Sequence, residues 1–398
     1  MKTSLLVLGG GIVGLATAFE FTRRYPGQRV VVVEKEPTVA GHQSSHNSGV
    51  LHSGIYYKPG TLRAKNCRVG KQAMEAFCQE HGIAFEICGK VIVAVSDSEL
   101  PALERIYDRG QQNGVRCEMI DAAKLKEIEP HTAGIRAIHV PEAGIVDYPA
   151  VCRKLAELII AAGGEIRTNC RVVKTHVGER EIALTTTAGD LTADYAVNCT
   201  GLFSDRTATA AGETPSAKIV PFRGEYYELT PQAAHLCRHL IYPVPDPNFP
   251  FLGVHFTRMV TGGVECGPNA VLAFAREGYR RRDVNLYDLA ETLLFPGFLK
   301  LAAKYWQTGV GEMWRSFSKA AFLQSLQRLV PAVRREDLVV GRTGVRAQAV
   351  GLDGAIVDDF VIQPQGRLVH VLNAPSPAAT SSLNIGKLVV EKLSEGLG

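Results

Sequence analysis

Three glycines near the N-terminus have the spacing of a turn that binds phosphate groups. Gly9, Gly11 and Gly14 follow an apolar run of strand length, Leu5–Leu8, and precede a segment of helical composition. In a Gly-x-Gly-x-x-Gly turn the first glycine permits the tight bend, the second lets the backbone approach a pyrophosphate, and the third lets helix and strand pack closely. The N–H groups at the start of the following helix attract phosphate because they carry a partial positive charge. This spacing predicts a dinucleotide site.

An acidic residue ends the next predicted strand, Arg29–Val33. Glu34 lies 20 residues after Gly14, where a carboxylate accepts hydrogen bonds from ribose hydroxyls. The same carboxylate would repel the 2′-phosphate of NADP. The alternative, a glycine-rich turn in another kind of α/β protein, leaves Glu34 unexplained. The complete unit therefore predicts an adenine dinucleotide without a 2′-phosphate.

A second candidate cofactor-binding segment lies near the C-terminus. Asn373–Ser382 follows an apolar strand and opens the last predicted helix, about Pro377–Leu397. Ser376 is a natural N-cap, and Pro377 suits the first helical position. A helix N-terminus directed at the pyrimidine edge of a flavin would stabilise negative charge on the reduced ring. Alone, the segment would be interpreted as a capped surface helix. Because NAD requires no second element of this kind, the two segments together favour FAD.

The composition is that of an ordinary globular protein. Of 398 residues, 46% are hydrophobic and 21% charged, which is enough for a large core and two domains. The net charge of +4 gives no basic footprint for nucleic acid, so no nucleic-acid partner is predicted, and it does not oppose an acidic substrate. The nine cysteines include no Cys-x-x-Cys pair, so neither a metal site nor a disulfide framework is predicted. Buried thiols, as at Cys67, Cys78, Cys88 and Cys199, indicate a reducing, cytosolic compartment.

One segment has the composition of a membrane-surface contact. No apolar run reaches the roughly 18 residues needed to span a bilayer, and the N-terminal apolar run is the first strand rather than a signal peptide. Leu293–Trp306 is apolar and aromatic and contains lysines, as in segments that touch a membrane. The favoured alternative is a helix packed on its own domain core. The expected location is cytoplasmic, with a peripheral contact at the inner face of the cell membrane if the first interpretation holds.

The order of predicted elements indicates an α/β fold, α+β overall, with a discontinuous Rossmann-like domain and a second domain built mostly on an antiparallel sheet. Short strands punctuated by Pro and Gly dominate 221–274, and 286–328 is predicted to be helical with one break at Pro296-Gly297. Strands are predicted at 91–95, 171–176, 182–186, 191–199, 338–340, 346–350, 355–362 and 368–373, and further helices at 62–81, 98–113 and 148–162. The predicted domains are residues 1–85, 145–220 and 335–398 for the cofactor, and 86–144 and 221–334 for the substrate.

Longer strings resemble a known family. The chain is similar over its whole length to the D-amino-acid-oxidase-like, or glycine-oxidase-like, FAD-dependent oxidoreductases, and within them to the L-2-hydroxyglutarate dehydrogenase (oxidase) subfamily. The family resemblance rests on Gly9–Glu34, Pro221–Tyr226, Gly344–Arg346 and Asn373–Gly386. The subfamily resemblance rests on His42–Gly60, Tyr242–Pro247, Phe251–Arg258 and Gly267–Phe274.

The resemblance implies oxidation of L-2-hydroxyglutarate, a small dicarboxylate hydroxy acid, to 2-oxoglutarate. A hydride would pass from C2 to flavin N5, and the electrons would go on to a quinone or to another acceptor such as an electron-transfer carrier. One alternative is an FAD-dependent amine or D-amino-acid-type oxidase with the same fold. A further alternative is an FAD-binding module without turnover of its own.

Such a reaction needs cations for the two carboxylates. Arginine is preferred because its planar fork matches a carboxylate with two parallel hydrogen bonds. The resemblance places the α-carboxylate at Arg346, on a strand beside the flavin. Arg258 and Arg223, with Lys58 after them, are candidates for the second carboxylate.

The reaction also needs a base near neutral pH, which suits histidine. His52 and His255 are the candidates, and a hydrogen bond from His52 to the flavin is an equal alternative. Tyr57, Tyr226, Gln348 and Asn373 are candidates for orienting the substrate. The predicted cofactor-binding residues are Gly9, Gly11, Ile12, Val13, Gly14, Glu34, Lys35, Ser45, His46, Asn47, Ser48, Val173, Thr200, Gly201, Pro375, Ser376, Ala378, Ala379 and Thr380.

Overall fold

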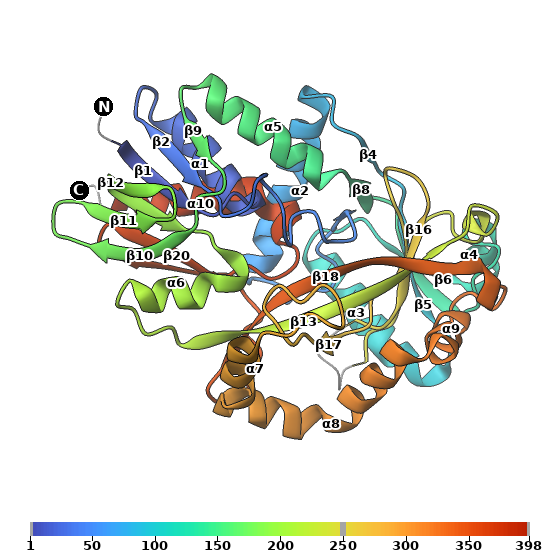
Figure 1. The fold of residues 1–398 in the computed structure, drawn as a ribbon. Coiled ribbons are helices and arrows are strands. Elements are labelled where there is room, and N and C mark those ends of the chain that lie inside the picture. Colours follow the sequence, from blue (N-terminus) through green and yellow to red (C-terminus); the bar gives the residue numbers. More distant parts are fainter. Residues whose placement is uncertain (1–2, 247–251, 396–398) are drawn as a thin grey trace.

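A computed structural model describes residues 3–246 and 252–395 and contains two large β-sheets with helices packed against them (Figure 1). The first sheet takes its strands from the beginning, the middle and the end of the chain, as predicted. It is parallel from β9 through β2, β1 and β12 to β20, with antiparallel strands at its margin. Its strands are β1 Thr3–Leu8, β2 Val30–Val33, β9 Glu165–Arg167, β10 Val172–Val177, β11 Ile182–Thr186, β12 Gly189–Asn198, β19 Val361–Gln365 and β20 Leu368–Asn373.

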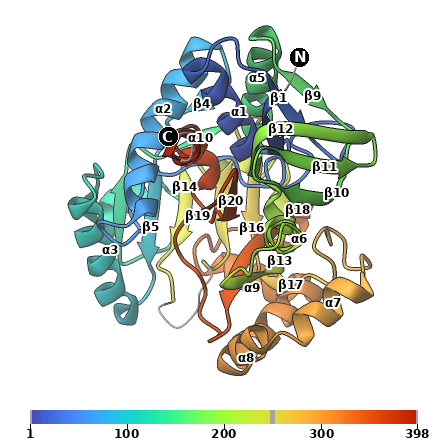
Figure 2. The ribbon, with the colours of Figure 1, turned by 90° about the vertical axis from the view of Figure 1, so that its left-hand side faces the viewer.

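The central strand β1 is buried on both faces, which explains its unbroken apolar sequence. Leu5 and Val7 pack with the helices, whereas Leu6 and Leu8 point to the opposite face and pack with residues of β11 and β12. Figure 2 shows α10 and α1 beside this sheet. The helices of this core are α1 Ile12–Arg24, α2 Leu62–Glu80, α5 Tyr148–Ala161 and α10 Ala378–Glu395.

The second sheet is mostly antiparallel and is built around two long strands, β13 and β18 (Figure 1). A small sheet of β3 Val50–Leu51, β8 Gly144–Val146 and β4 Phe85–Glu86 accompanies the two large ones. The second sheet contains β5 Lys90–Ala94, β6 Glu118–Asp121, β7 Arg136–Val140, β13 Ala217–Leu229, β14 Leu240–Pro243, β15 His255–Arg258, β16 Val264–Gly267, β17 Val271–Leu272 and β18 Leu338–Gly351.

Strand β18 corrects two predictions. The strands predicted at 338–340 and 346–350 are one continuous strand. Gly344, within this strand, is needed for a close contact, because a Cβ at this position would lie 2.3 Å from the carbonyl oxygen of His46. The predicted strand at 355–362 is also wrong, since β19 begins only at Val361.

The predicted domain boundary at residue 335 does not follow the sheets. Because β18 pairs with β13, residues 338–351 belong to the second sheet. The division into domains stays a prediction.

The helical region after residue 285 has two breaks between helices rather than one, and the helix that begins at Pro296 is also kinked at Tyr305 (φ −116°, ψ 21°). α7 Leu286–Leu293 ends before Pro296, which opens α8 Pro296–Phe317. A second break falls at Ser318, whose hydroxyl accepts a hydrogen bond from the Ala321 amide (3.2 Å) and so caps α9 Lys319–Gln327. Among the described residues, no helix is long and apolar enough to cross a membrane. The remaining helices are α3 Leu100–Gln112, α4 Ala122–Ile128 and α6 Ser204–Ala210, with 3₁₀ turns at Asp97–Glu99, Gly201–Phe203, Ala234–Leu236 and Arg335–Asp337.

Helix α10 begins one residue later than predicted. The Pro377 carbonyl accepts the amide of Ser381 (2.9 Å), so Pro377 precedes the first helical residue, Ala378. The Ser376 hydroxyl lies 3.4 Å from Nε2 of His52. The predicted end of this helix, at Leu397, lies outside the described residues. All nine cysteines are free; Cys67, Cys78 and Cys88 are buried as predicted, whereas Cys199 is half-buried.

Candidate active site

A cavity of about 1570 Å³ is lined by residues of both large sheets. The carboxyl ends of β1 and β2 and the segment before α10 line one part of it. Residues of β13, β14 and β18 line another. Because pockets for drug-sized ligands span roughly 300–1,000 Å³, this cavity has room for a dinucleotide together with a small second molecule.

The glycine turn leaves space along its backbone that side chains at Gly9, Gly11 or Gly14 would occupy. Gly9 has φ +108°, and a Cβ there would lie 2.5 Å from the carbonyl oxygen of Cys199. A Cβ at Gly14 would lie 2.1 Å from the carbonyl oxygen of Gly9, so Gly14 is needed for close packing beneath the turn rather than at the cavity surface. Gly11 occupies the N-cap of α1 and leaves this helix end without a capping side chain of its own. The turn therefore fits a pyrophosphate.

Glu34 is buried at the cavity wall in a fixed orientation. Its Oε2 accepts the Gly10 amide (2.8 Å) and its Oε1 accepts the Glu36 amide (2.9 Å). A carboxylate accepts about four hydrogen bonds, so Glu34 keeps capacity for ribose hydroxyls.

Lys35, predicted to bind the cofactor, lies at the centre of an ionic cluster. Its ammonium is 2.5 Å from both Glu36 and Glu277, and His42 Nε2 lies 2.9 Å and 3.0 Å from the same carboxylates. Hydrogen bonds from Lys35 and His42 lower the pKa of Glu36 to about 2. His42, Glu36 and Glu277 are close enough to hold a metal ion, but the Lys35 ammonium already contacts both carboxylates. The cluster joins the loop after β2 to the 277–279 segment.

The segment before α10 contacts the loop that contains the candidate base. Thr380 Oγ1 accepts the amide of His52 (3.2 Å) and lies 2.8 Å from the Tyr148 hydroxyl. Asn373 donates to the carbonyls of Val357 (3.0 Å) and Asp359 (2.9 Å), so its amide group also holds a neighbouring loop. The small residues of this segment, which include Ala378 and Ala379, leave space at the start of α10 for a flat ring system.

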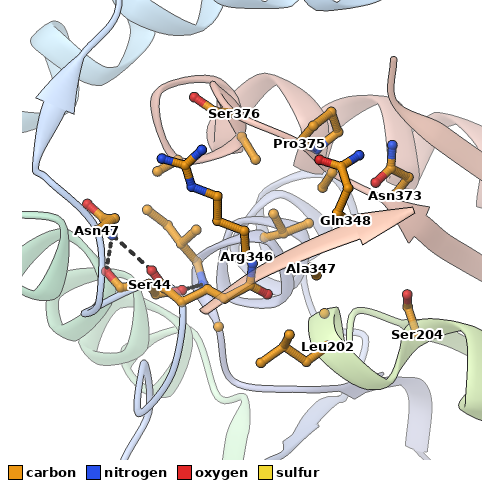
Figure 3. A pocket seen from close by; sticks show the side chains of 18 of the residues that line it. Ser44, Asn47, Leu202, Ser204, Arg346, Ala347, Gln348, Asn373, Pro375 and Ser376 are labelled. Atoms are coloured by element: carbon orange, nitrogen blue, oxygen red, sulfur yellow. Dashed lines mark hydrogen bonds between the residues drawn. The ribbon is translucent and has the colours of Figure 1, made fainter. Parts of the chain in front are cut away.

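Arg346 extends from β18 into the cavity, toward the loop that contains Pro375 and Ser376 (Figure 3). Gln348 lies on the same side of the strand, as the two-residue period of a strand requires. Arg346 is half-buried and lies within hydrogen-bonding reach of the Tyr226 hydroxyl. A guanidinium in this position can bind a carboxylate of a molecule in the cavity.

Both candidate bases line the cavity. Burial, followed by repulsion from nearby cations, lowers the pKa of His52 to about 3. Burial likewise lowers the pKa of His255 to about 3. Nδ1 of His255 lies 2.9 Å from the carbonyl oxygen of Gly253. A carbonyl can only accept, so Nδ1 bears the proton and Nε2 has a lone pair. Both rings are therefore neutral at pH 7, and each has one ring nitrogen with a lone pair.

Two predicted substrate cations do not reach the cavity. Arg223 is buried and pairs with Glu225 (3.0 Å), and Arg258 pairs with Glu86 through two contacts (3.0 and 3.1 Å). The reason is strand alternation: Tyr226 and His255 face the cavity, so a residue three positions away on the same strand faces the other side. This geometry does not support Arg223 or Arg258 as the residue that holds the second carboxylate, and that role stays a prediction.

The other predicted site residues lie mostly along the same cavity. Ser45, like Gly14, is not among its lining residues in the described chain. His46 Nδ1 lies 2.8 Å from the Thr343 carbonyl oxygen, which the histidine binds as a donor, and its ring packs on Tyr279. The predicted residues that line the cavity are Gly9, Gly11, Ile12, Val13, Glu34, Lys35, His46, Asn47, Ser48, His52, Tyr57, Lys58, Val173, Thr200, Gly201, Tyr226, His255, Arg346, Gln348, Asn373, Pro375, Ser376, Ala378, Ala379 and Thr380.

Sequence reasoning missed several lining residues. Ser44 accepts the amide of Ile12 (2.9 Å) and thereby fixes the start of α1. Arg63 donates to the carbonyls of Ser376 (2.6 Å) and Asp358 (3.0 Å) and lies over the Tyr57 ring. Tyr56 and Tyr242 add two aromatic rings to the wall. The signal for Arg63 was weak, because its position near the start of a predicted helix resembles that of a surface residue.

Comparisons with known proteins agree with this geometry. A family model described as FAD dependent oxidoreductase matches residues 4–392. The L-2-hydroxyglutarate dehydrogenase of Indibacter alkaliphilus is 50% identical over 98% of each chain. The enzyme of that name from Escherichia coli strain K12 is 42% identical over 98% of this chain and 92% of its own length. The human mitochondrial L-2-hydroxyglutarate dehydrogenase is also 42% identical, over 98% of this chain and 88% of its own length.

Solved structures share the fold at lower identity. The FAD-bound L-α-glycerophosphate oxidase from Mycoplasma pneumoniae superposes with a TM-score of 0.81 at 20% identity, over 99% of this chain and 95% of that one. Glycine oxidase from Geobacillus kaustophilus superposes with a TM-score of 0.75 at 19% identity, again over 99% of this chain and 95% of that one. The chain therefore belongs to the FAD-dependent oxidoreductase family and, within it, to the group of the L-2-hydroxyglutarate dehydrogenases.

Proposed function

We propose that this protein oxidises L-2-hydroxyglutarate to 2-oxoglutarate with FAD as its cofactor. One observation supports this most strongly: a guanidinium and two neutral imidazoles line the same cavity as the dinucleotide turn. FAD, when bound, supplies the acceptor for the hydride that leaves C2. Gly9, Gly11 and Glu34 would hold its dinucleotide part, and the Pro375–Thr380 segment would lie near its ring.

Arg346 binds and orients the α-carboxylate of the substrate in this proposal. A bidentate guanidinium–carboxylate pair fixes two atoms of a small acid and so restricts where its C2 points. Tyr226, which lies beside Arg346, adds a hydroxyl to the same part of the wall. Gln348, on the same side of β18, is placed to contact the rest of the substrate.

One imidazole of the His52 and His255 pair removes the hydroxyl proton. The fixed tautomer of His255 leaves Nε2 as an acceptor, and the ring of His255 packs on Tyr242 with centroids 4.1 Å apart. His52 lies opposite the Ser376 hydroxyl. Because both rings are uncharged, either of them can accept the proton without first losing one.

Anaerobic mixing of the purified yellow protein with L-2-hydroxyglutarate tests the proposal. The flavin absorbance should bleach rapidly with this acid and not with D-2-hydroxyglutarate, L-lactate, glycine or sarcosine. Bleaching by an amine instead would replace the function with that of an amine oxidase. No bleaching by any of these compounds would favour a cofactor-binding module without turnover.

We further propose that α7 and α8 contact an anionic membrane surface, where a quinone takes the electrons. Trp306, Val310, Trp314 and Phe317 follow one face of α8, and each is 62–67% exposed. Ten of the 19 exposed large hydrophobic residues in the described chain lie between 284 and 317. The acidic residue of α8, Glu312, is buried, whereas the lysines of this helix are exposed. An apolar face beside lysines suits an anionic bilayer surface.

Co-sedimentation with vesicles of phosphatidylglycerol and phosphatidylcholine tests this contact. Replacing Trp306 and Trp314 together by serine should reduce vesicle binding about tenfold or more, since each loses a large apolar side chain. The matched control is Ile160→Ser, an exposed apolar residue on α5, which should not change binding. Equal sedimentation of all three proteins would contradict the contact, and a quinone analogue that does not oxidise the reduced protein would contradict the acceptor.

A further inference from the structure

Lys90 is a buried cation directly behind the aromatic wall of the substrate cavity. It lies on β5, and its side chain is 1% exposed. Its ammonium is 4.7 Å from the centre of the Tyr56 ring and 5.0 Å from the centre of the Tyr242 ring. Both rings line the cavity. Lys90 itself is not among the lining residues, so its ammonium acts on a molecule in the cavity from behind residues that include these two tyrosines.

Lys90 is a buried cation that has no carboxylate partner within the described residues, unlike Lys35 and Arg63. Lys35 contacts Glu36 and Glu277, and Arg63 pairs with Asp358. Within residues 3–246 and 252–395, Lys90 has neither an ion pair nor a hydrogen bond, and its contacts are with the two rings. Two aromatic faces stabilise an ammonium only in part, and a buried charge without a counterion is costly.

The charge of Lys90 persists at neutral pH. Burial lowers the pKa of this lysine only to about 8, so the ammonium form predominates at pH 7. An anion in the cavity would offset the cost of the buried charge, and the low-polarity tyrosine layer screens the attraction much less than water does.

A dicarboxylate substrate calls for a second cation besides Arg346. Of the other cations expected from the sequence, Arg223 and Arg258 bind carboxylates of the protein itself. Lys58 lines the cavity but is exposed, so solvent screens its charge more than that of the buried Lys90.

We infer that Lys90, acting through Tyr56 and Tyr242, makes the cavity prefer a dianion to a monoanion of the same length. Lys90 is thus a positioning residue that contributes specificity and does not touch the substrate. The inference rests on the proposed function for its choice of a five-carbon dicarboxylate.

Binding of two unreactive acids to the purified FAD-containing protein tests this inference. Glutarate and pentanoate have five carbons each and differ in one carboxylate, and neither has a hydroxyl to oxidise. Their dissociation constants can be measured from the shift of the flavin absorbance. The wild-type protein should bind glutarate more tightly, and Lys90→Met should reduce the ratio of the two constants roughly tenfold. Lys90→Arg, which keeps the charge, should restore most of the preference.

A matched control is Lys71→Met. Lys71 is also a buried lysine, but it pairs with Glu75 (2.5 Å) and does not line the cavity, so the ratio should not change. A purely structural role of Lys90 would weaken both acids equally and lower the melting temperature. If Lys90→Met does not fold, Lys90→Gln takes its place.

The inference would be overturned if Lys90→Met kept the wild-type ratio of the pentanoate and glutarate dissociation constants. It would also be overturned if Lys90→Arg lost as much of the preference for glutarate as Lys90→Met does. A wild-type protein without preference for glutarate would overturn it as well. A protein that prefers glutarate through Lys90 but is not bleached by L-2-hydroxyglutarate would instead refute only the proposed function.

Discussion

The two ends of the cavity are built in different ways. At the dinucleotide end, Gly9–Glu34 is one continuous stretch, and backbone groups and missing side chains form the site. At the substrate end, His52, His255 and Arg346 come from three distant segments, and side chains form the site. A local backbone site can be recognised from spacing, whereas a site assembled from distant strands depends on which face of each strand points inward.

The largest effect should come from the substrate end, at the base. Replacing the histidine that takes the proton by asparagine should lower kcat about 10²- to 10⁴-fold, whereas the flavin content should stay the same. His52→Asn and His255→Asn, measured side by side in steady-state assays, assign the role. Near-normal kcat in both variants would contradict a histidine base.

A smaller effect is expected at the dinucleotide end. A Cβ at Gly11 meets only Ser44 Oγ, at 3.3 Å, and the backbone there is ordinary, so Gly11→Ala should fold. The added methyl group would face the pyrophosphate and weaken FAD binding about 10- to 100-fold, the cost of overpacking a tight site. The ratio of flavin to protein absorbance measures this, with Gly309→Ala, an unobstructed glycine of α8, as the control. Full flavin content in Gly11→Ala would refute the assignment.

The pH dependence reports the same base without a mutation. Because burial lowers the pKa of both histidines to about 3, kcat/KM, which follows the free enzyme, should be level from pH 7 to about 5. In the unfolded chain these histidines bind protons near pH 6.5, before the folded ones do. The free energy of unfolding should therefore fall as the pH drops from about 6.5 toward 3. An acid limb centred near 6.5 would contradict the lowered pKa of whichever histidine is the base.

The smallest effect is expected for Arg258→Gln. Its partner Glu86 is exposed, and the pair lies outside the cavity, so kcat/KM should change less than about threefold, as for a surface salt bridge. A loss of a hundredfold would return Arg258 to the substrate site and contradict the alternation argument.

The sequence was sufficient for the parts of the fold whose signals are local. The turn, Glu34 and most helices of the first core were predicted within a few residues. Arg223 and Arg258 each lie three residues from a predicted residue that lines the cavity, Tyr226 or His255. Strand alternation places residues three positions apart on opposite faces, so this conflict between the predictions could be found in the sequence itself.

Other features depend on tertiary contacts that spacing does not contain. The sequence predicted two strands on either side of the glycines of β18, but the strand is continuous, and Gly344 lies against the His46 backbone from a distant part of the chain. Lys90 lay outside the predicted strand, which began at Val91, so its position did not indicate burial. Its burial depends on Tyr56 and Tyr242, which are far away in the sequence.

Flavin reduction in Arg346→Met tests most directly whether the two ends act separately. This variant should bind FAD as fully as the wild-type protein, because Arg346 belongs to the substrate end. On anaerobic mixing with L-2-hydroxyglutarate, its flavin should be reduced about 10²- to 10³-fold more slowly at low substrate concentration, the cost of removing a buried charge partner. Wild-type reduction rates, or loss of FAD together with activity, would contradict the division of the cavity into a backbone-built cofactor end and a side-chain-built substrate end.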